Sequence, residues 1–220
     1  MRLYLSSLSF EPRSLSEFLG PSPRVGLIAN ALDFLPPFPR HEAVTSTLNS
    51  LGQISDATEI DLRRYFKDPS GLAASLEQVD ALWVSGGSCF LLAAALSRSG
   101  AAPVISRRVR TREINYAGSS AGAVVASTSL APATTCEDPQ VVRQIYHSAP
   151  VYTGLALLTL TVIPHFAEIP AKDALPTNLM RDYCKASGID FLTISDGSAI
   201  VVEDQQVTEI TFAPDVATLF

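Results

Sequence analysis

The chain of 220 residues is long enough for one sizeable domain, and no shift in composition along it marks a second core. Apolar residues make up 47% of the chain and charged residues only 17%, which indicates elements that are buried on both faces. The formal net charge of -6 argues against nucleic acid as a partner, because phosphate binding needs clustered Lys and Arg. We therefore expect a single α/β domain over residues 1–220.

No targeting or membrane-spanning segment is recognisable in the sequence. Residues 1–7 lack the apolar stretch of a signal peptide, and threonines interrupt the longest apolar run, 154–164. The three cysteines are widely spaced, which fits neither a disulfide framework nor a zinc site. The sequence thus predicts a cytoplasmic protein with no membrane partner, no metal and no cofactor, and it leaves a homo-oligomer open.

Short apolar runs alternate with helical patterns from the N-terminus onward. The predicted strands are residues 2–7, 25–30, 58–62, 81–85, 113–117, 157–163 and 191–195. The predicted helices are residues 42–52, 71–77, 90–99, 103–110, 121–127 and 174–187. This alternation predicts a mostly parallel, doubly wound sheet flanked by helices.

Two further segments complete the predicted architecture. Residues 199–203 and 206–212 alternate apolar and polar side chains on either side of a short turn, which predicts a C-terminal β-hairpin on one edge of the sheet. The proline-rich segment 35–39 follows a predicted strand, and we interpret it as a plain connector.

The strongest chemical signal is the pattern G-x-S-x-G at residues 118–122, with Ser120 at its centre. The pattern lies between a predicted strand and a run of small residues, where its glycines permit a sharp strand-to-helix turn. We predict Ser120 as a nucleophile and the backbone N–H of Ala121 as an oxyanion donor. A Gly/Ser-rich turn without chemistry is the alternative interpretation, and Ser119 is the neighbouring rival.

A serine nucleophile needs a base, and the chain has three histidines. His165 directly follows an apolar strand, so it is expected at the carboxyl edge where parallel sheets assemble their sites. His147 falls in a polar segment, and His41 opens a predicted helix near the prolines. We therefore predict His165 as the base.

The histidine in turn needs an acceptor that orients it. Asp196 follows the strand 191–195 and precedes a glycine, so we predict it as the third member, with Glu168 and Asp173 as competing carboxylates. In the α/β-hydrolase fold the acid precedes the histidine along the chain. The opposite order here argues against an esterase or lipase of that fold.

A second glycine-rich segment, residues 84–88, ends another predicted strand and opens a helix. Its glycines allow bare N–H groups to approach a ligand closely. We predict Gly87 as the second oxyanion donor, with Gly86 next in preference. Gly86 and Ser88 are also candidate substrate-binding residues.

These landmarks together resemble peptidase E, the aspartyl dipeptidase family of serine peptidases. The resemblance rests on residues 84–92, 118–123, 164–166 and 196–197, which occur in the order of the family's glycine-rich strand end, nucleophile, histidine and acid motifs. It covers about half of the chain. Aspartate stands here where the family commonly has glutamate, and Val124 and Ile163 stand where it tends to have asparagine.

The resemblance implies a fold like that of class I glutamine amidotransferases and a metal-free dipeptidase that cleaves after an N-terminal aspartate. It implies the roles given above for Ser120, His165 and Asp196. An acidic substrate group needs a cation, and Arg181 and Lys172 are the nearby candidates. Two other hypotheses stay open: a cyanophycinase-like hydrolase of β-aspartyl linkages, and a catalytically silent ligand-binding protein.

Overall fold

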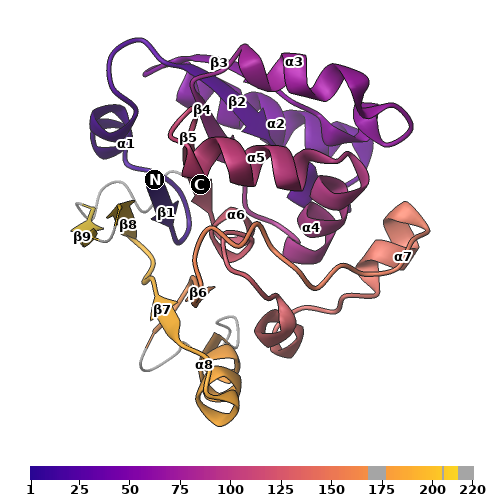
Figure 1. Cartoon of the computed structure of the whole chain (residues 1–220), viewed down its shortest axis with the longest axis vertical. Helices are drawn as coiled ribbons and strands as arrows, with labels where there is room; N and C mark the ends of the chain where they lie inside the picture. The colour runs from indigo at the N-terminus through magenta and orange to yellow at the C-terminus, as the bar shows by residue number, and fades with distance from the viewer. Residues whose placement is uncertain (168–176, 205, 213–220) are drawn as a thin grey trace.

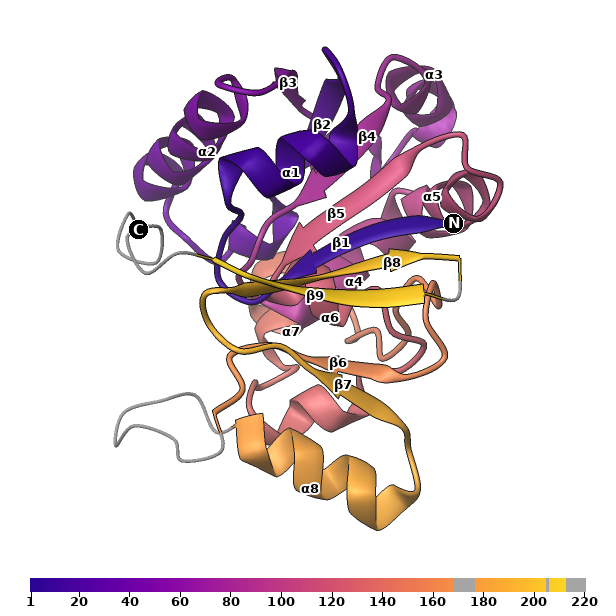
Figure 2. The same cartoon turned by 90° about the vertical axis from the view of Figure 1, so that its left-hand side faces the viewer.

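The computed structural model describes residues 1–167, 177–204 and 206–212 (Figure 1). The strands of its large sheet are β1 (Arg2–Ser6), β2 (Arg24–Ile28), β3 (Asp56–Glu59), β4 (Ala81–Val84), β5 (Asn115–Ser119), β8 (Ser198–Glu203) and β9 (Gln206–Thr211). They lie in the order β3-β2-β4-β5-β1-β8-β9 (Figure 2). Strands β1 to β5 pair in parallel, and the β8–β9 hairpin joins β1 antiparallel. The predicted α/β sheet with a C-terminal hairpin at its edge is confirmed.

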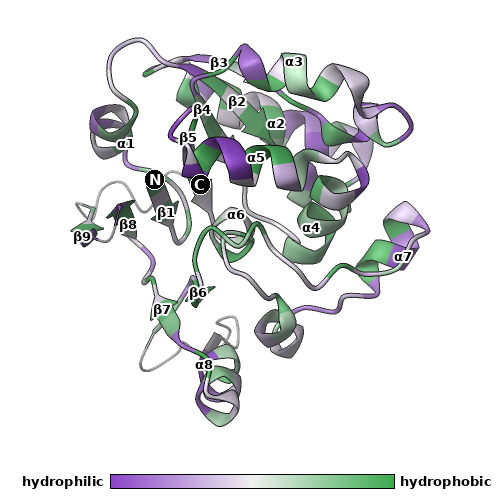
Figure 3. Ribbon diagram, in the orientation of Figure 1, coloured by the Kyte–Doolittle hydropathy of each residue, from purple (hydrophilic) through white to green (hydrophobic). Residues whose placement is uncertain are grey.

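Helices cover both faces of this sheet. They are α1 (Pro12–Leu19), α2 (Pro37–Leu51), α3 (Leu72–Glu77), α4 (Cys89–Arg98), α5 (Ala101–Arg110), α6 (Ala121–Val124), α7 (Val141–Tyr146) and α8 (Thr177–Ser187). Helices α1 and α2 pack in one hydrophobic cluster with β2, whereas α3 to α6 belong to the larger cluster on the other side. Helix α4 is mostly hydrophobic in Figure 3 because it is buried along nearly its whole length.

Within the described ranges, no single helix is long and apolar enough to span a membrane. Helices α4 and α5 reach that length and composition only as a pair, with a bend of 95° between them. The chain turns from one to the other at Gly100, whose φ of +74° is easily adopted only by glycine.

The structure differs from the expected strand pattern at β6 (Thr161–Ile163) and β7 (Phe191–Thr193). These two strands form a separate parallel pair below the large sheet (Figure 2). Only the last three residues of the predicted strand 157–163 are extended, because the backbone of Leu158 bonds instead to Ala126 and Thr128, in the segment after α6. The small sheet shares the hydrophobic cluster that includes Val162.

Helices α1 and α7 were not predicted, and helix α2 begins earlier than predicted. In α1 the Glu11 carboxylate accepts the N–H groups of Arg13 and Ser14, which caps the first turn. Helix α2 begins at Pro37 and not near residue 42, so the segment 35–39 is not simply a connector. Proline suits the first turn of a helix, where the N–H groups have no intrahelical acceptor.

Candidate active site

Ser120 occupies a sharp turn between β5 and α6. Its φ of +48° and ψ of -112° are strained for a serine, and its N–H donates to the carbonyl of Ser6 over 3.1 Å. A Cβ atom on Gly122 would lie 2.1 Å from the carbonyl oxygen of Val84, and one on Gly118 would lie 2.8 Å from Gly122. Glycine is therefore required at both positions of the predicted pattern, because a Cβ atom there would clash with the neighbouring backbone.

His165 follows β6 and reaches Ser120 at the end of β5 in the large sheet. Its Nε2 lies 2.9 Å from Oγ of Ser120, and its Nδ1 lies 2.8 Å from Oδ1 of Asp196. Because an ionised carboxylate can only accept, this geometry requires the proton on Nδ1 of a neutral ring, which leaves Nε2 free to accept from the serine hydroxyl. The histidine side chain is 14% exposed and that of Asp196 is 57% exposed, so water reaches the acid more than the base.

Ser7, directly after β1, joins the two residues that approach Ser120. Its hydroxyl donates to Oδ1 of Asp196 over 2.6 Å, and it accepts the backbone N–H of His165 over 2.7 Å. Ser7 is completely buried. The hydroxyl therefore fixes the histidine backbone and the aspartate carboxylate relative to each other.

The glycine-rich segment after β4 lies against Ser120. Gly87 has a φ of +131°, and a Cβ atom there would lie 2.4 Å from the carbonyl oxygen of Ala31. A Cβ atom on Gly86 would lie 3.0 Å from Cβ of Ser120. Glycine at these two positions lets the backbone lie against both the nucleophile and the turn that contains Ala31.

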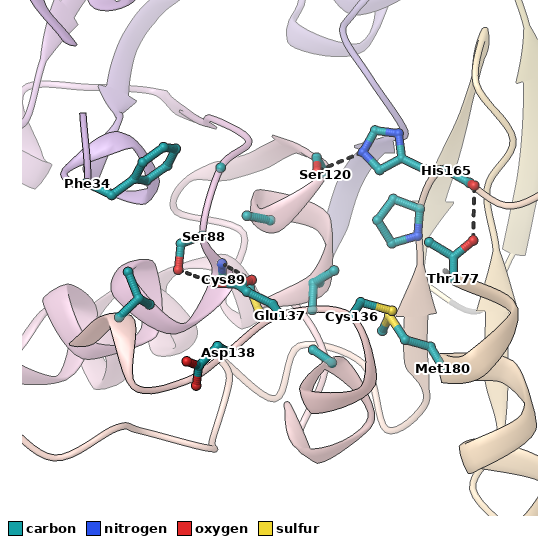
Figure 4. Close-up of a pocket in the computed structure, with 16 residues that line it drawn as sticks. Phe34, Ser88, Cys89, Ser120, Cys136, Glu137, Asp138, His165, Thr177 and Met180 are labelled. Atoms are coloured by element: carbon teal, nitrogen blue, oxygen red, sulfur yellow. Dashed lines mark hydrogen bonds between the residues drawn. The ribbon is translucent and has the colours of Figure 1, made fainter. Parts of the chain in front are cut away.

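A cavity of about 480 Å³ opens beside Ser120 (Figure 4). It is lined by Phe34, Gly87, Ser88, Cys89, Ser120, Ala121, Val124, Ala133, Cys136, Glu137, Asp138, Val141, Pro164, His165, Thr177 and Met180. Most of these side chains are apolar, and two are carboxylates. Among the residues with a described position, the lining includes no lysine or arginine. Nor do three or more metal-ligating side chains gather anywhere in the described chain.

One of the two carboxylates is firmly held at the start of α4. Oε1 of Glu137 accepts the hydroxyl of Ser88, and Oε2 accepts the backbone N–H of Cys89 over 3.0 Å. Figure 4 shows these three residues below Ser120 and His165. The carboxylate thus accepts one of the N–H groups that have no intrahelical acceptor at the N-terminus of α4.

Comparison with known proteins identifies the family. The model of Peptidase family S51 matches residues 34–210. The chain belongs to peptidase family S51. This S51 peptidase is 31% identical over 166 residues to an uncharacterised peptidase of Listeria innocua. The match covers 76% of this chain and 74% of that protein. It is also 28% identical over 194 residues to peptidase E of Streptomyces coelicolor, covering 81% and 75% respectively.

Solved structures support the fold of this S51 peptidase. A protein from Listeria monocytogenes described as a peptidase E superposes with a TM-score of 0.74 at 23% identity, covering 96% of this chain and 98% of that one. A peptidase from an acI-B1 actinobacterium superposes with a TM-score of 0.67 at 17% identity, covering 96% and 88%. The predicted relation to peptidase E is therefore confirmed.

Most of the predicted site residues of this S51 peptidase lie together. Ser120, His165 and Asp196 form one hydrogen-bonded chain, and Gly87 and Ala121 line the adjacent cavity. The histidine and the acid reach the site from the small sheet, not from the large sheet as predicted.

The predicted substrate-binding residues are divided. Ser88 lines the cavity, but its hydroxyl donates to Glu137. Gly86 has no side chain, which allows its backbone to lie against Ser120. Arg181 does not belong to the cavity lining: it pairs with Asp182 over 2.9 Å and lies over the ring of Phe166. The substrate-binding role of Arg181 stays a prediction, and its contacts in the described residues are those two neighbours.

Three other residues weighed from the sequence, Glu168, Lys172 and Asp173, lie outside the described residues. Sequence reasoning also missed Ser7 and Glu137. Ser7 carried a usable signal, since it directly follows the strand that pairs with β5 in parallel. Glu137 follows the short 3₁₀ helix Ala131–Thr135 and has no strand before it, so the strand-edge rule could not find it.

Proposed function

We propose that this S51 peptidase is a serine peptidase that hydrolyses short peptides through an acyl-enzyme on Ser120. The observation behind this proposal is the hydrogen-bonded chain from Ser120 through His165 to Asp196, at the mouth of a peptide-sized cavity. Nε2 of His165 takes the hydroxyl proton as Oγ attacks the scissile carbonyl carbon. Asp196 holds the ring in the required tautomer and stabilises the imidazolium that forms.

The carbonyl oxygen gains negative charge as the serine attacks. The N–H groups of Gly87 and Ala121 are the proposed donors to this oxyanion, because both residues line the cavity beside the nucleophile. The imidazolium of His165 then protonates the leaving amine, and the peptide C–N bond breaks. Water, deprotonated by the same histidine, hydrolyses the acyl-enzyme and restores Ser120.

Replacing the nucleophile tests the proposal. We expect Ser120→Ala to fold normally and to lose at least about three orders of magnitude in peptide hydrolysis, since the reaction then has no acyl-enzyme route. Ser119→Ala is the matched control, because this neighbouring serine is the rejected candidate and does not line the cavity. A fluorophosphonate probe, followed by mass spectrometry of the labelled peptide, reads out the same site independently.

Retained turnover in Ser120→Ala would rule out this mechanism. Failure of the probe to label Ser120, together with intact peptide binding, would favour the catalytically silent alternative. Activity confined to β-aspartyl dipeptides would favour the cyanophycinase-like alternative.

The preference for an N-terminal aspartate is a separate part of the proposed function. Its source is the resemblance to peptidase E, and it requires a cation near the substrate side chain. The described cavity instead contains Glu137 and Asp138 among apolar walls such as Val124 and Met180. This lining favours a second candidate: cleavage after a first residue with an uncharged side chain.

A substrate comparison decides between the two preferences. Initial rates on Asp-Leu, β-Asp-Leu and Met-Leu at equal concentration measure the effect of the first side chain directly. A higher kcat/KM for Asp-Leu supports the aspartyl preference, and a higher value for Met-Leu supports the uncharged one.

A further inference from the structure

The Glu137 carboxylate has hydrogen-bonding capacity that its two protein partners do not use. Ser88 donates to one oxygen and the backbone of Cys89 donates to the other. The Cys89 thiol also hydrogen-bonds to this carboxylate. A carboxylate offers about four acceptor positions, so about one remains. The residue lines the cavity beside Ser120, where that position can serve a bound ligand.

The geometry of a peptide limits where its amino group can lie. In a substrate cleaved at its first peptide bond, the α-nitrogen is two bonds from the attacked carbonyl carbon, a separation of about 2.5 Å. If the N–H of Gly87 holds the oxyanion, that nitrogen lies in the same cavity as the residues that follow Gly87. Ser88 and Cys89 are those residues, and both contact Glu137.

We propose that Glu137 binds the α-ammonium group of the substrate's first residue. This inference rests on the proposed function and adds which side chain holds the amino terminus of the substrate. An ammonium group entering an apolar cavity loses hydration, and a charged hydrogen-bond acceptor compensates for that loss. Glu137 suits this role better than Asp138, which is exposed and accepts the backbone N–H of Gln140.

A purely structural role for Glu137 makes a different prediction. Helix α4 already has an N-cap in Ser88, whose hydroxyl accepts the N–H of Leu91 over 3.1 Å. If Glu137 served only to hold this turn in place, its loss would affect every substrate to the same degree. The two roles are therefore separable by substrates that differ only in their amino group.

The test compares leucine p-nitroanilide with N-acetyl-leucine p-nitroanilide, and uses p-nitrophenyl acetate as an ester without an amino group. We expect the unmodified enzyme to favour the free amine at least about a hundredfold in kcat/KM. Glu137→Gln should lower kcat/KM for the free amine at least tenfold, mainly through KM, and change the other two substrates less than twofold. Glu137→Asp, which keeps the charge, should retain the preference for the free amine.

The pH dependence supplies a readout that a structural role would not change. An α-amino group loses its proton near pH 8. We expect KM for the free amine to rise above that pH in the unmodified enzyme but to stay nearly flat in Glu137→Gln. Glu77→Gln, an exposed change on α3, is the control and should behave like the unmodified enzyme.

Specific outcomes would overturn the inference. Equal losses on all three substrates in Glu137→Gln would assign the residue a structural role, and an unchanged preference for the free amine would exclude it as the binding group. Both outcomes leave Ser120 labelled by the fluorophosphonate probe. An enzyme that is neither labelled nor active on any of the three substrates would instead contradict the proposed function, and this inference with it.

Discussion

Ser7 shows how one hydroxyl group can position two other residues of the candidate site. It donates to Asp196 and accepts from the backbone of His165, so both segments of the small sheet are tied to the end of β1. The large exposed fraction of Asp196 makes this tie important, because few other contacts restrain its carboxylate. Ser7 does not contact the reacting atoms, and its proposed role is positioning.

We expect Ser7→Ala to lower kcat about 10- to 100-fold with little change in KM. The physical reason is the loss of orientation of the base, which catalysis needs and substrate binding does not. Steady-state kinetics on the best dipeptide measures the split between kcat and KM. Ser6→Ala is a matched control, since the Ser6 hydroxyl is buried but has no hydrogen-bond partner in the described chain.

A change in KM alone after Ser7→Ala would contradict the positioning role. So would an equal loss of kcat in Ser6→Ala, which would indicate general disturbance of β1. Rescue by Ser7→Thr, which restores a hydroxyl, would support the role further.

The sequence located some residues of the site and not others, for a physical reason. Ser120, His165 and Asp196 each follow a strand, and the carboxyl ends of strands are where α/β folds place polar groups. Ser7 has the same placement, but its significance depends on partners about 160 and 190 residues away. Such contacts become visible only in three dimensions.

At the scale of elements, a cluster of charged side chains fastens α2 to the ends of β2 and β3. Arg40 donates to Asp33 over 2.6 Å and to Glu59 over 2.8 Å, and Arg63 pairs with Asp61 over 2.7 Å. The Asp33 and Arg40 side chains are almost completely buried. Buried ion pairs need partners on every side, and this cluster supplies them.

Asp61 makes part of this cluster dependent on pH. Burial raises the pKa of its carboxyl, but hydrogen bonds from Arg63 and Asn30 outweigh burial and lower that pKa to about 2. A lowered pKa in the folded state stabilises the fold above the usual aspartate range near pH 4, and the stabilisation is lost as the pH falls towards 2. The contribution at neutral pH is about 2 kcal/mol.

We expect Asp61→Asn to remove this pH-dependent contribution to stability. The free energy of unfolding of the unmodified protein should fall more steeply between pH 4 and pH 2 than that of the variant, and the two curves should converge at the acid end. Urea unfolding at a series of pH values measures both curves. Parallel curves across this window would contradict the assignment to Asp61.

Helices α1 and α7 show why some elements escaped prediction. The first turn of α1 is stabilised by Glu11, a less usual capping residue than Ser, Thr, Asp or Asn. Helix α7 has only six residues, and tertiary contacts such as the hydrogen bond from Tyr146 to Asp33 hold it in place. Short helices depend on packing more than on local propensity, so sequence pattern alone indicates them poorly.

For the whole molecule, the candidate site lies where two sheets meet. Ser120 belongs to the large sheet, whereas the histidine and the acid follow the strands of the small one. One hydrophobic cluster joins them, since it contains both Tyr116 of β5 and Val162 of β6. Packing in this cluster therefore maintains the distance between Ser120 and His165.

We expect Val162→Ala to loosen the small sheet and to lower kcat. Val162 is completely buried, and removing its two methyl groups costs roughly 1–3 kcal/mol. Native-state hydrogen exchange should show β6 and β7 losing protection before β1, β4 and β5. Val25→Ala is the comparison, because Val25 is buried in the cluster on the other face of the large sheet.

A uniform loss of protection across both sheets in Val162→Ala would contradict this separation.

The sequence predicted every one of these strands, but not their division into two sheets. The apolar pattern of a strand indicates which of its residues are buried, but not which sheet the strand joins. The division into two sheets depends on the hydrogen bonds between the backbone of Leu158 and the segment after α6.

The order of the site residues along the chain also has a consequence for synthesis. Ser7 and Ser120 are made first, the histidine 45 residues after the nucleophile, and the acid last, after β7. A growing chain on the ribosome thus holds its serine for some time without a base or an acid. The proposed catalytic group of Ser120, His165 and Asp196 is therefore complete only once the chain beyond β7 has been made.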